Sequence, residues 1–396
     1  MRIAHVITRL IIGGAQENTL LICAGLAEAG HDVTLIAGTQ TGPEGSLWSE
    51  AVRMGVRTIE FPPLVRQVAP LTDWSCAREL AALFRREQFD VVHTHSSKAG
   101  ILGRWAAHKA GTPLVVHTIH GMSFNRTQTP PVRWFYRSLE RRAAPWTDAF
   151  ISVADAMTAQ AVAAGIAPAE RFTTIYSGMR VDDFHADPDL RTMNRAVWKL
   201  EPDQIVIGTV ARLFRNKGYE HILAALPRIV ERCPRARFVW VGDGRDRGRY
   251  QATLAKLGRT GRVRFEGLVP PARIPQLLAG FDILLHASLW EGLPRAAVQA
   301  LLTEVPVVCF ALDGASEVVE TGVTGTCVRP GDTAGLADAV IELANDADRR
   351  AALGREGRRR CLERFDYRRM VRDIAALYET RASAPAIGPI ESPHRA

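Results

Sequence analysis

The chain has 396 residues, more than one hydrophobic core usually serves, so we expect two domains. Hydrophobic residues make up 47% and charged residues 23%, as in ordinary globular proteins, and no apolar run reaches the roughly 18 residues that span a bilayer. The formal net charge of +8 favours anionic partners, and because no nucleic-acid motif is present we expect phosphate ligands or an anionic membrane surface rather than nucleic acid.

The start of the chain and the cysteines bear on its compartment. The opening MRIAHVITRL predicts a short strand and lacks the long apolar core of a signal peptide. The six cysteines lie far apart without a CxxC pair, which indicates free thiols in a reducing compartment rather than a zinc site or a disulfide framework. We therefore expect a cytoplasmic protein, with a peripheral location at the inner face of the cell membrane as the alternative.

Short apolar runs alternate with amphipathic stretches along the chain, which is typical of parallel sheets with crossover helices. Near-continuous Val and Ile content predicts strands that are buried on both faces. In the first half the predicted strands are 2–7, 32–38, 56–61, 89–95, 113–120, 149–154 and 171–177, with helices over Gln16–Ala29, Asp73–Arg86 and Ala99–Ala110. In the second half they are 204–213, 237–244, 262–268, 281–288 and 305–310.

A polar stretch without strand signal separates the two halves. It runs from about Asp182 to Asp203, and after it the alternation restarts. Two Rossmann-like, doubly wound α/β domains follow, over residues 1–185 and 200–362. Ligands of such folds bind at the carboxyl ends of the strands, here in a cleft where the two domains face each other. The Pro-, Ala- and Ser-rich tail over 381–396 is predicted to be disordered.

Two loops at strand ends suit phosphate groups. Gly13 and Gly14 follow the first strand and open a helix, so the backbone can approach a ligand closely, although a plain turn would use the same residues. Arg212 and Lys217 follow a buried strand in ARLFRNKG and suit a diphosphate, the alternative being ordinary surface cations. A complete GxGxxG is absent, since Gly242-x-Gly244 is followed by Gly248 one residue too late, which disfavours a nicotinamide oxidoreductase.

The most informative segment is SLWEGLPRAAVQALL. Glu291, Gly292 and Leu293 follow a predicted strand, and Pro294 stands where a helix would begin. The helix N-terminus would face an anionic group, and Glu291 could accept hydrogen bonds from sugar hydroxyls. The alternative is an exposed acid before a helix, but the whole string at a strand end favours a ligand site.

Three histidines also lie near strand ends. His93 and His95 could suggest a metal site, but no carboxylate partner is evident, and a satisfied buried histidine is the favoured interpretation of His93. His120 precedes Gly121 and is better placed to contact a substrate. The Asp-x-Asp pairs at 187–189 and 346–348 fall in polar or helix-flanking sequence, so we expect no bound metal and no cofactor.

A helical stretch near the middle of the first domain combines basic and aromatic residues. Arg133, Arg137 and Arg141 are spaced by four in PVRWFYRSLERRAAPW, beside Trp134 and Phe135. Such a face suits an anionic membrane interface, while a solvated face with Phe135 in the core is the alternative that we favour slightly.

Taken together, the motifs resemble glycosyltransferase family 4, which has the GT-B fold and includes bacterial enzymes of capsule and exopolysaccharide assembly. VVHTHSSKAGILGR, VVHTIHG, GTVARLFRNKG, EGLP and GVTGTCVRPGD occur in the family's order and rough spacing, and the resemblance covers nearly the whole chain. It implies a retaining transferase that needs no metal, with a final helix over 363–380 crossing back to the first domain.

The resemblance also implies roles for individual residues. Arg212 and Lys217 match the pair that holds the donor diphosphate, and Gly14 matches a loop glycine whose N–H approaches the phosphate. Glu291 and His120 match residues of the sugar site, and in such a mechanism the leaving phosphate helps to deprotonate the acceptor. The family's second glutamate, which contacts the ribose, is replaced by Gln299. An amide can still bind a diol, but without the charge-assisted component.

The sequence therefore predicts a hexosyltransferase that uses a nucleotide diphosphate sugar, UDP first and GDP next, and a glycan or lipid-linked acceptor. A sugar-nucleotide epimerase on the same fold and a non-catalytic sugar-nucleotide-binding subunit stay open, the latter because of Gln299. A phosphorylase would need a lysine that carries pyridoxal phosphate, and nothing in the sequence marks one.

Overall fold

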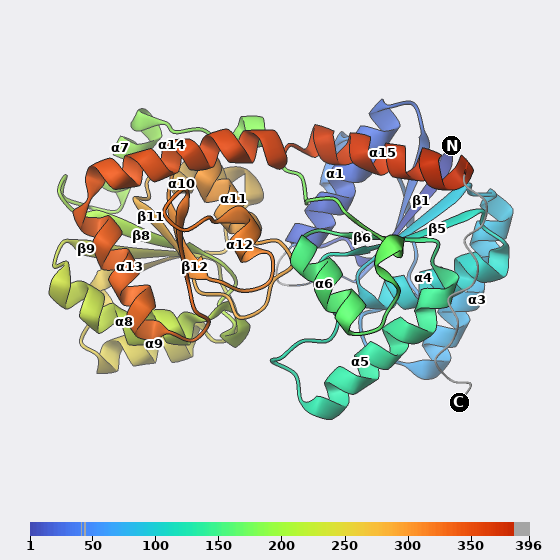
Figure 1. Cartoon of the computed structure of the whole chain (residues 1–396), viewed down its shortest axis with the longest axis horizontal. Coiled ribbons are helices and arrows are strands. Elements are labelled where there is room, and N and C mark those ends of the chain that lie inside the picture. The colour runs from blue at the N-terminus through green and yellow to red at the C-terminus, as the bar shows by residue number, and fades with distance from the viewer. Residues whose placement is uncertain (41, 43–44, 384–396) are drawn as a thin grey trace. The chain divides into compact units, whose positions relative to one another are not determined.

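The computed structural model describes residues 1–40, 42 and 45–383, which form two compact units (Figure 1). The first unit comprises Met1–Met179 and the chain from Tyr367 onward, and the second unit comprises Arg180–Asp366. Each unit is an α/β structure with one parallel sheet.

The sheet of the first unit has seven strands in the order β3-β2-β1-β4-β5-β6-β7, and the neighbouring strands pair in parallel. Each of the seven strands predicted in the first half is present. Their bounds are β1 (Arg2–Arg9), β2 (Asp32–Gly38), β3 (Arg57–Glu60), β4 (Val91–His95), β5 (Leu114–Ile119), β6 (Ala149–Ser152) and β7 (Phe172–Thr174).

Side chains alternate between the two faces along each strand, and both faces of this sheet are apolar. Helices therefore cover both faces. On β1, Ile3 and Ile7 pack in the cluster formed with α1 and α15, whereas Ala4 and Val6 pack in the cluster formed with α3 and α4. The helices of the first unit are α1 (Gly14–Glu28), α2 (Trp48–Arg53), α3 (Pro70–Glu87), α4 (Ser97–Ala110), α5 (Pro130–Ala143), α6 (Asp155–Ala163) and α15 (Tyr367–Ser383).

The C-terminal helix α15 lies beside α1 in the first unit (Figure 1). The two helices approach closely at Gly25, where an added Cβ would lie 2.6 Å from a methyl group of Val371. A larger residue at position 25 would push α15 away from the sheet. Of the tail over 381–396, Arg381–Ser383 are helical, and residues 384–396 lie outside the described residues.

The second unit has a six-stranded parallel sheet in the order β10-β9-β8-β11-β12-β13. Its strands are β8 (Ile205–Val210), β9 (Ala236–Val241), β10 (Val263–Gly267), β11 (Ile283–His286), β12 (Val307–Phe310) and β13 (Gly325–Val328), of which β13 was not predicted. Its helices are α7 (Pro188–Val197), α8 (Tyr219–Arg232), α9 (Arg247–Lys256), α10 (Ile274–Leu278), α11 (Arg295–Leu302), α12 (Ala315–Val318), α13 (Thr333–Asn345) and α14 (Ala347–Arg364).

The polar stretch between the halves folds as part of the second unit rather than standing between the units. It contains α7, whose N-cap Asp187 accepts a hydrogen bond from the Leu190 N–H at 2.9 Å and is followed by Pro188 at the first helical position. Asp346 caps α14 in the same way through the Arg349 N–H. The first aspartate of each Asp-x-Asp pair is therefore a helix cap. All six cysteines are free thiols, five of them buried.

Candidate functional site

The carboxyl ends of β8 and β11, which are adjacent in the second sheet, bring two predicted site residues together. The Lys217 Nζ lies 2.6 Å from the Glu291 Oε1, and the two side chains are only 15% and 17% exposed. The His286 Nε2 lies 3.2 Å from the same oxygen, although without hydrogen-bond geometry. Both contacts are made by Oε1, so neither of them engages Oε2.

The electrostatics of this cluster keep the Glu291 carboxylate charged. Burial by itself would raise the pKa of the Glu291 carboxyl, but attraction to Lys217 and contact with His286 outweigh burial and hold this pKa below its usual range. Lys217 carries three N–H donors, so it can hold Glu291 and still donate to an anionic ligand. An ionised acceptor and a cation therefore stand side by side at the strand ends.

Backbone contacts fix the loops that carry the cluster. The Asp313 carboxylate accepts a hydrogen bond from the Glu291 N–H at 2.8 Å, and the Leu289 N–H donates to the Asn216 carbonyl at 2.9 Å. Gly218 follows Lys217 with φ of +72°, and a Cβ there would lie 1.8 Å from the Ala287 carbonyl oxygen. Only glycine allows this approach, so the loop after β8 and the loop after β11 are held together.

The other predicted residues of the second unit lie around these loops. Arg212 is exposed, with its guanidinium 4.9 Å from the centre of the Phe214 ring. Gly292 and Leu293 are buried, and Gln299 lies partly buried in α11, which begins one residue after Pro294. The structure thus joins Lys217 and Glu291 directly, and places Gln299 on the helix that follows the Glu291 loop.

The remaining predicted residues belong to the first unit. Gly13 is the N-cap of α1, where its carbonyl accepts a hydrogen bond from the Glu17 N–H at 2.9 Å, and Gly14 is the exposed first residue of the helix. His120 follows β5 and is partly buried, with its Nε2 2.9 Å from the Nδ1 of His95. His93 is fully buried, and its two ring nitrogens contact Tyr378 at 2.5 Å and Thr118 at 2.6 Å.

Several neighbours of the predicted residues were missed by sequence reasoning: His5, His286, Asp313 and Tyr378. His5 lies opposite His93 in the register of β1 and β4, and Tyr378 reaches His93 from α15. Once the strands are aligned as parallel neighbours, the shared face of His5 and His93 can be read from the sequence. Tyr378 and Asp313 have no local signal, because their partners are far away along the chain.

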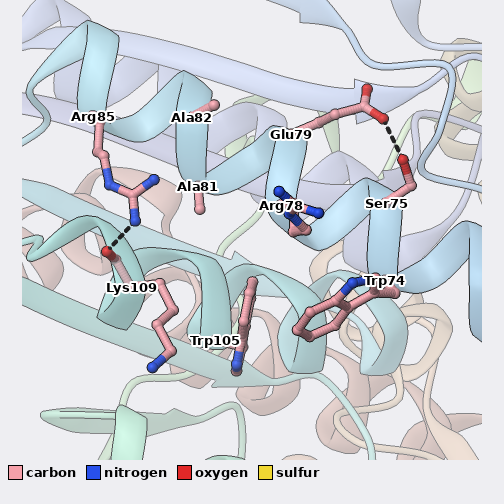
Figure 2. A pocket seen from close by; sticks show the side chains of 9 residues that line it. All are labelled: Trp74, Ser75, Arg78, Glu79, Ala81, Ala82, Arg85, Trp105 and Lys109. Atoms are coloured by element: carbon pink, nitrogen blue, oxygen red, sulfur yellow. Dashed lines mark hydrogen bonds between the residues drawn. The ribbon is translucent and has the colours of Figure 1, made fainter.

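A hollow of about 640 Å³ lies between α3 and α4 on the outside of the first unit (Figure 2). Figure 2 shows the rings of Trp74 and Trp105 close together and Arg85 donating to the Lys109 carbonyl. The two ring centres are 5.2 Å apart, and the hydrogen bond is 2.6 Å long. None of the predicted site residues lines this hollow. It is therefore a surface feature of the helical layer rather than a part of the strand-end site.

The predicted basic and aromatic face on α5 is only partly as expected. Phe135 is 41% exposed and Trp134 63% exposed, so the interpretation that placed Phe135 in the core was wrong. Arg133 is exposed, whereas the Arg141 Nε donates to the Ala164 carbonyl at 2.9 Å and is held against the unit. In the part of the chain that the structure describes, no helix combines the length and apolar character needed to cross a membrane.

Two family models match the chain, one over each unit. The model for the glycosyl transferase 4-like domain matches residues 13–178, and the model for glycosyl transferases group 1 matches residues 191–360. The chain belongs to glycosyltransferase family 4. Its fold is of the GT-B class, as the sequence predicted, and the predicted activity as a glycosyltransferase is confirmed at the level of the family.

Known relatives span nearly the whole chain of this glycosyltransferase. The UDP-Gal:α-D-GlcNAc-diphosphoundecaprenol α-1,3-galactosyltransferase of Escherichia coli is 28% identical over 87% of this chain and 88% of its own length. A GDP-mannose-dependent α-(1-6)-phosphatidylinositol monomannoside mannosyltransferase of Mycolicibacterium smegmatis is 27% identical over 94% and 96%. The crystal structure of HepE of Anabaena with UDP and glucose superposes with a TM-score of 0.82 at 22% identity, covering 96% of this chain and all of that one.

Proposed function

We propose that this glycosyltransferase moves a hexose from a UDP-sugar, or next a GDP-sugar, to a glycan or lipid-linked acceptor, with retention of anomeric configuration. The two sequence relatives described above use UDP- and GDP-sugars and act on lipid-linked acceptors, and the related HepE binds UDP and glucose. A role in polysaccharide assembly is supported by another relative, the capsular polysaccharide biosynthesis glycosyltransferase CapM of Staphylococcus aureus, which is 23% identical over 80% of this chain and 84% of its own length.

The observation that carries the proposal is the contact of Lys217 with Glu291. Lys217 would hold the donor diphosphate together with Arg212, while Glu291 would accept hydrogen bonds from hydroxyls of the transferred sugar. The 2.6 Å contact between the two side chains supports this proposal, because a group that binds phosphate and a group that binds the sugar would then meet where the sugar–phosphate bond lies. In the first unit, His120, Gly13 and Gly14 stay predicted ligand contacts.

The proposal is tested with a panel of donors. A UDP-hexose at about 100 times its Kd should stabilise the protein by about 2.7 kcal/mol, because only the folded state binds it. The same donor should yield free UDP faster when acceptor is present. A panel of UDP-, GDP-, ADP- and CMP-sugars that gives no thermal shift would contradict the donor assignment.

A non-catalytic sugar-nucleotide-binding subunit is the second candidate, because Gln299 stands where the family has a glutamate. It predicts a thermal shift without any acceptor-dependent release of UDP. Product analysis by mass spectrometry separates the two candidates.

Exchange of Gln299 for glutamate should tighten donor binding by about fivefold, or about 1 kcal/mol, and preserve transfer. The added charge would strengthen hydrogen bonds to the ribose hydroxyls. Calorimetric titration with the donor measures this effect. Glu291→Gln, the same chemical change in reverse, should instead lower turnover. If Gln299→Glu loses activity while Glu291→Gln is silent, the two roles are wrongly assigned.

Transfer should survive removal of divalent ions by EDTA. The charge of the leaving diphosphate would be met by Arg212, Lys217 and the N-terminus of α11. Initial rates in EDTA and in Mg²⁺ or Mn²⁺ make the comparison, and a strict dependence on either ion would contradict this assignment of charges.

The first unit should bind anionic vesicles through the exposed start of α5. Val132, Trp134 and Phe135 are exposed there next to Arg133, a combination suited to a bilayer interface. Sedimentation with phosphatidylglycerol vesicles should weaken with salt, and it should fall several-fold in Trp134→Ser/Phe135→Ser. Met193→Ser/Val197→Ser, which removes exposed apolar side chains from α7, is the matched control. Equal binding by both double variants would exclude α5 as the contact.

A further inference from the structure

A chain of three histidine rings runs through the first unit and ends at His120. The Nδ1 of His5 lies 2.9 Å from the Nε2 of His95, and the Nδ1 of His95 lies 2.9 Å from the Nε2 of His120. His5 and His95 are fully buried on β1 and β4, and His120 is partly buried. Every link therefore joins one ring nitrogen to another, without a hydroxyl or carboxylate between them.

The rings are held in place by a fourth histidine. His93 lies with its ring centre 4.9 Å from that of His5 and 4.3 Å from that of His95. Its own nitrogens are engaged by the Tyr378 hydroxyl from α15 and the Thr118 hydroxyl from β5. These short contacts disfavour His93 as a metal ligand, although the ligand atoms of His5, His93 and His95 all lie within 4.8 Å of one another.

The protonation of the chain follows from counting donors. A neutral imidazole has one N–H donor and one acceptor nitrogen. His95 must therefore donate in one link and accept in the other, so both hydrogen bonds run in the same direction. Either His5 donates to His95 and His95 to His120, or His120 donates to His95 and His95 to His5.

The far nitrogen of His5 decides between these two directions. Its Nε2 is buried and has no hydrogen-bond partner among the described residues. If the protons pointed toward His5, this atom would be a buried N–H without an acceptor, which is the rarer and costlier defect in folded proteins. If they point toward His120, it is only an unused lone pair.

We propose that the buried chain from His5 through His95 fixes the tautomer of His120, so that its Nε2 accepts from His95 and its Nδ1 carries the proton. His5 and His95 are then positioning residues, and the Nδ1 of His120 is an N–H group rather than an acceptor nitrogen. Such an N–H group can donate a hydrogen bond to a hydroxyl oxygen of the sugar that is transferred. Only this last step rests on the proposed function, since the tautomer itself can be measured without substrate.

The first test is the tautomer of His120 in the full chain. Two-bond ¹H–¹⁵N correlation spectra of ¹⁵N-histidine-labelled protein at pH 7.5, with His120 assigned by its loss in His120→Gln, should show a protonated Nδ1 and an unprotonated Nε2. A protonated Nε2 or an imidazolium ion would overturn the proposal. So would a specific change of the His5, His93 and His95 signals on addition of one equivalent of Zn²⁺, which would assign a metal to the cluster.

The second test separates positioning from packing at His95. In His95→Asn the carboxamide nitrogen can take the place of Nδ1 and still donate to His120, whereas in His95→Gln it reaches toward the place of Nε2 and the link to His120 is lost. We expect His95→Asn to keep the His120 tautomer and kcat, and His95→Gln to lower kcat about tenfold with a mixture of tautomers. A packing role predicts the opposite order, because Gln is closer to His in volume. If the tautomer is as proposed but neither variant changes kcat, the role of His120 in the sugar site is wrong and the positioning chain stands.

Discussion

Lys217→Ala should lower the turnover for sugar transfer by at least about a hundredfold, the range observed when a charge-stabilising donor is removed from an active site. Lys217 is held at 2.6 Å from Glu291 and is the cation proposed to meet the charge that develops on the leaving diphosphate. Initial rates with saturating donor and acceptor measure the effect. Arg212→Ala should act in the same direction, since both cations would face the same phosphates.

The control for this prediction has to separate chemistry from folding. Lys217→Ala leaves the Glu291 carboxylate without its cation, which should cost about 2 kcal/mol of stability for a pair that is only partly buried. Lys217→Arg keeps the charge and should keep most of that stability, yet lose activity because the guanidinium is larger and planar. Arg228→Ala, which breaks the exposed ion pair with Asp338, should leave transfer unchanged. Wild-type turnover in both Lys217 variants would refute the role of Lys217.

The strands of both sheets could be predicted because parallel strands buried on both faces require near-continuous apolar sequence. The helix α7, by contrast, was not predicted. Its apolar residues Leu190, Met193 and Val197 have helical spacing, but the segment is polar overall and was therefore interpreted as a linker. The signal that was available is local, with Asp187 at the N-cap and Pro188 at the first helical position.

The residues of the candidate site could also be predicted only in part. Lys217 and Glu291 could be chosen because each follows a strand, and strand ends meet at one edge of a parallel sheet. Their direct contact could not be predicted, since it depends on β8 and β11 being neighbours although 72 residues separate Val210 from Ile283. His5 was missed because its partner His95 lies on a different strand, and Tyr378 because it lies on α15, far along the chain from its partner His93. Groups at the ends of elements can be found from the sequence, whereas groups that support them from distant elements cannot.

The buried histidines should make the protein sensitive to mild acid. Burial lowers the pKa of His5 to about 3 and those of His93, His95 and His117 well below the usual value, and the positive charge of Arg104 adds to the effect at His117. In the unfolded chain these imidazoles titrate near their ordinary pKa of about 6.5. Above that pH both states are neutral and stability does not change through them. Below pH 6.5 the unfolded state binds protons that the folded state does not bind, so stability falls as the pH falls.

Each such group should contribute up to about 1.4 kcal/mol of lost stability per pH unit, and the four together up to about 5 kcal/mol per pH unit below pH 6. The Glu291 carboxyl, whose pKa is depressed, affects stability only at lower pH. Its contribution to stability is lost as the pH falls below the ordinary pKa of a carboxyl. Urea denaturation at pH 7.5, 6.0, 5.5 and 5.0 measures the slope. His117→Gln should reduce this slope by the contribution of one proton, about 1.4 kcal/mol per pH unit. His185→Gln, at the exposed surface, should leave the slope as in the wild type. A free energy of unfolding that stays constant between pH 7.5 and 5.0 would show that the buried imidazoles take up protons in the folded protein at the same pH as in the unfolded chain.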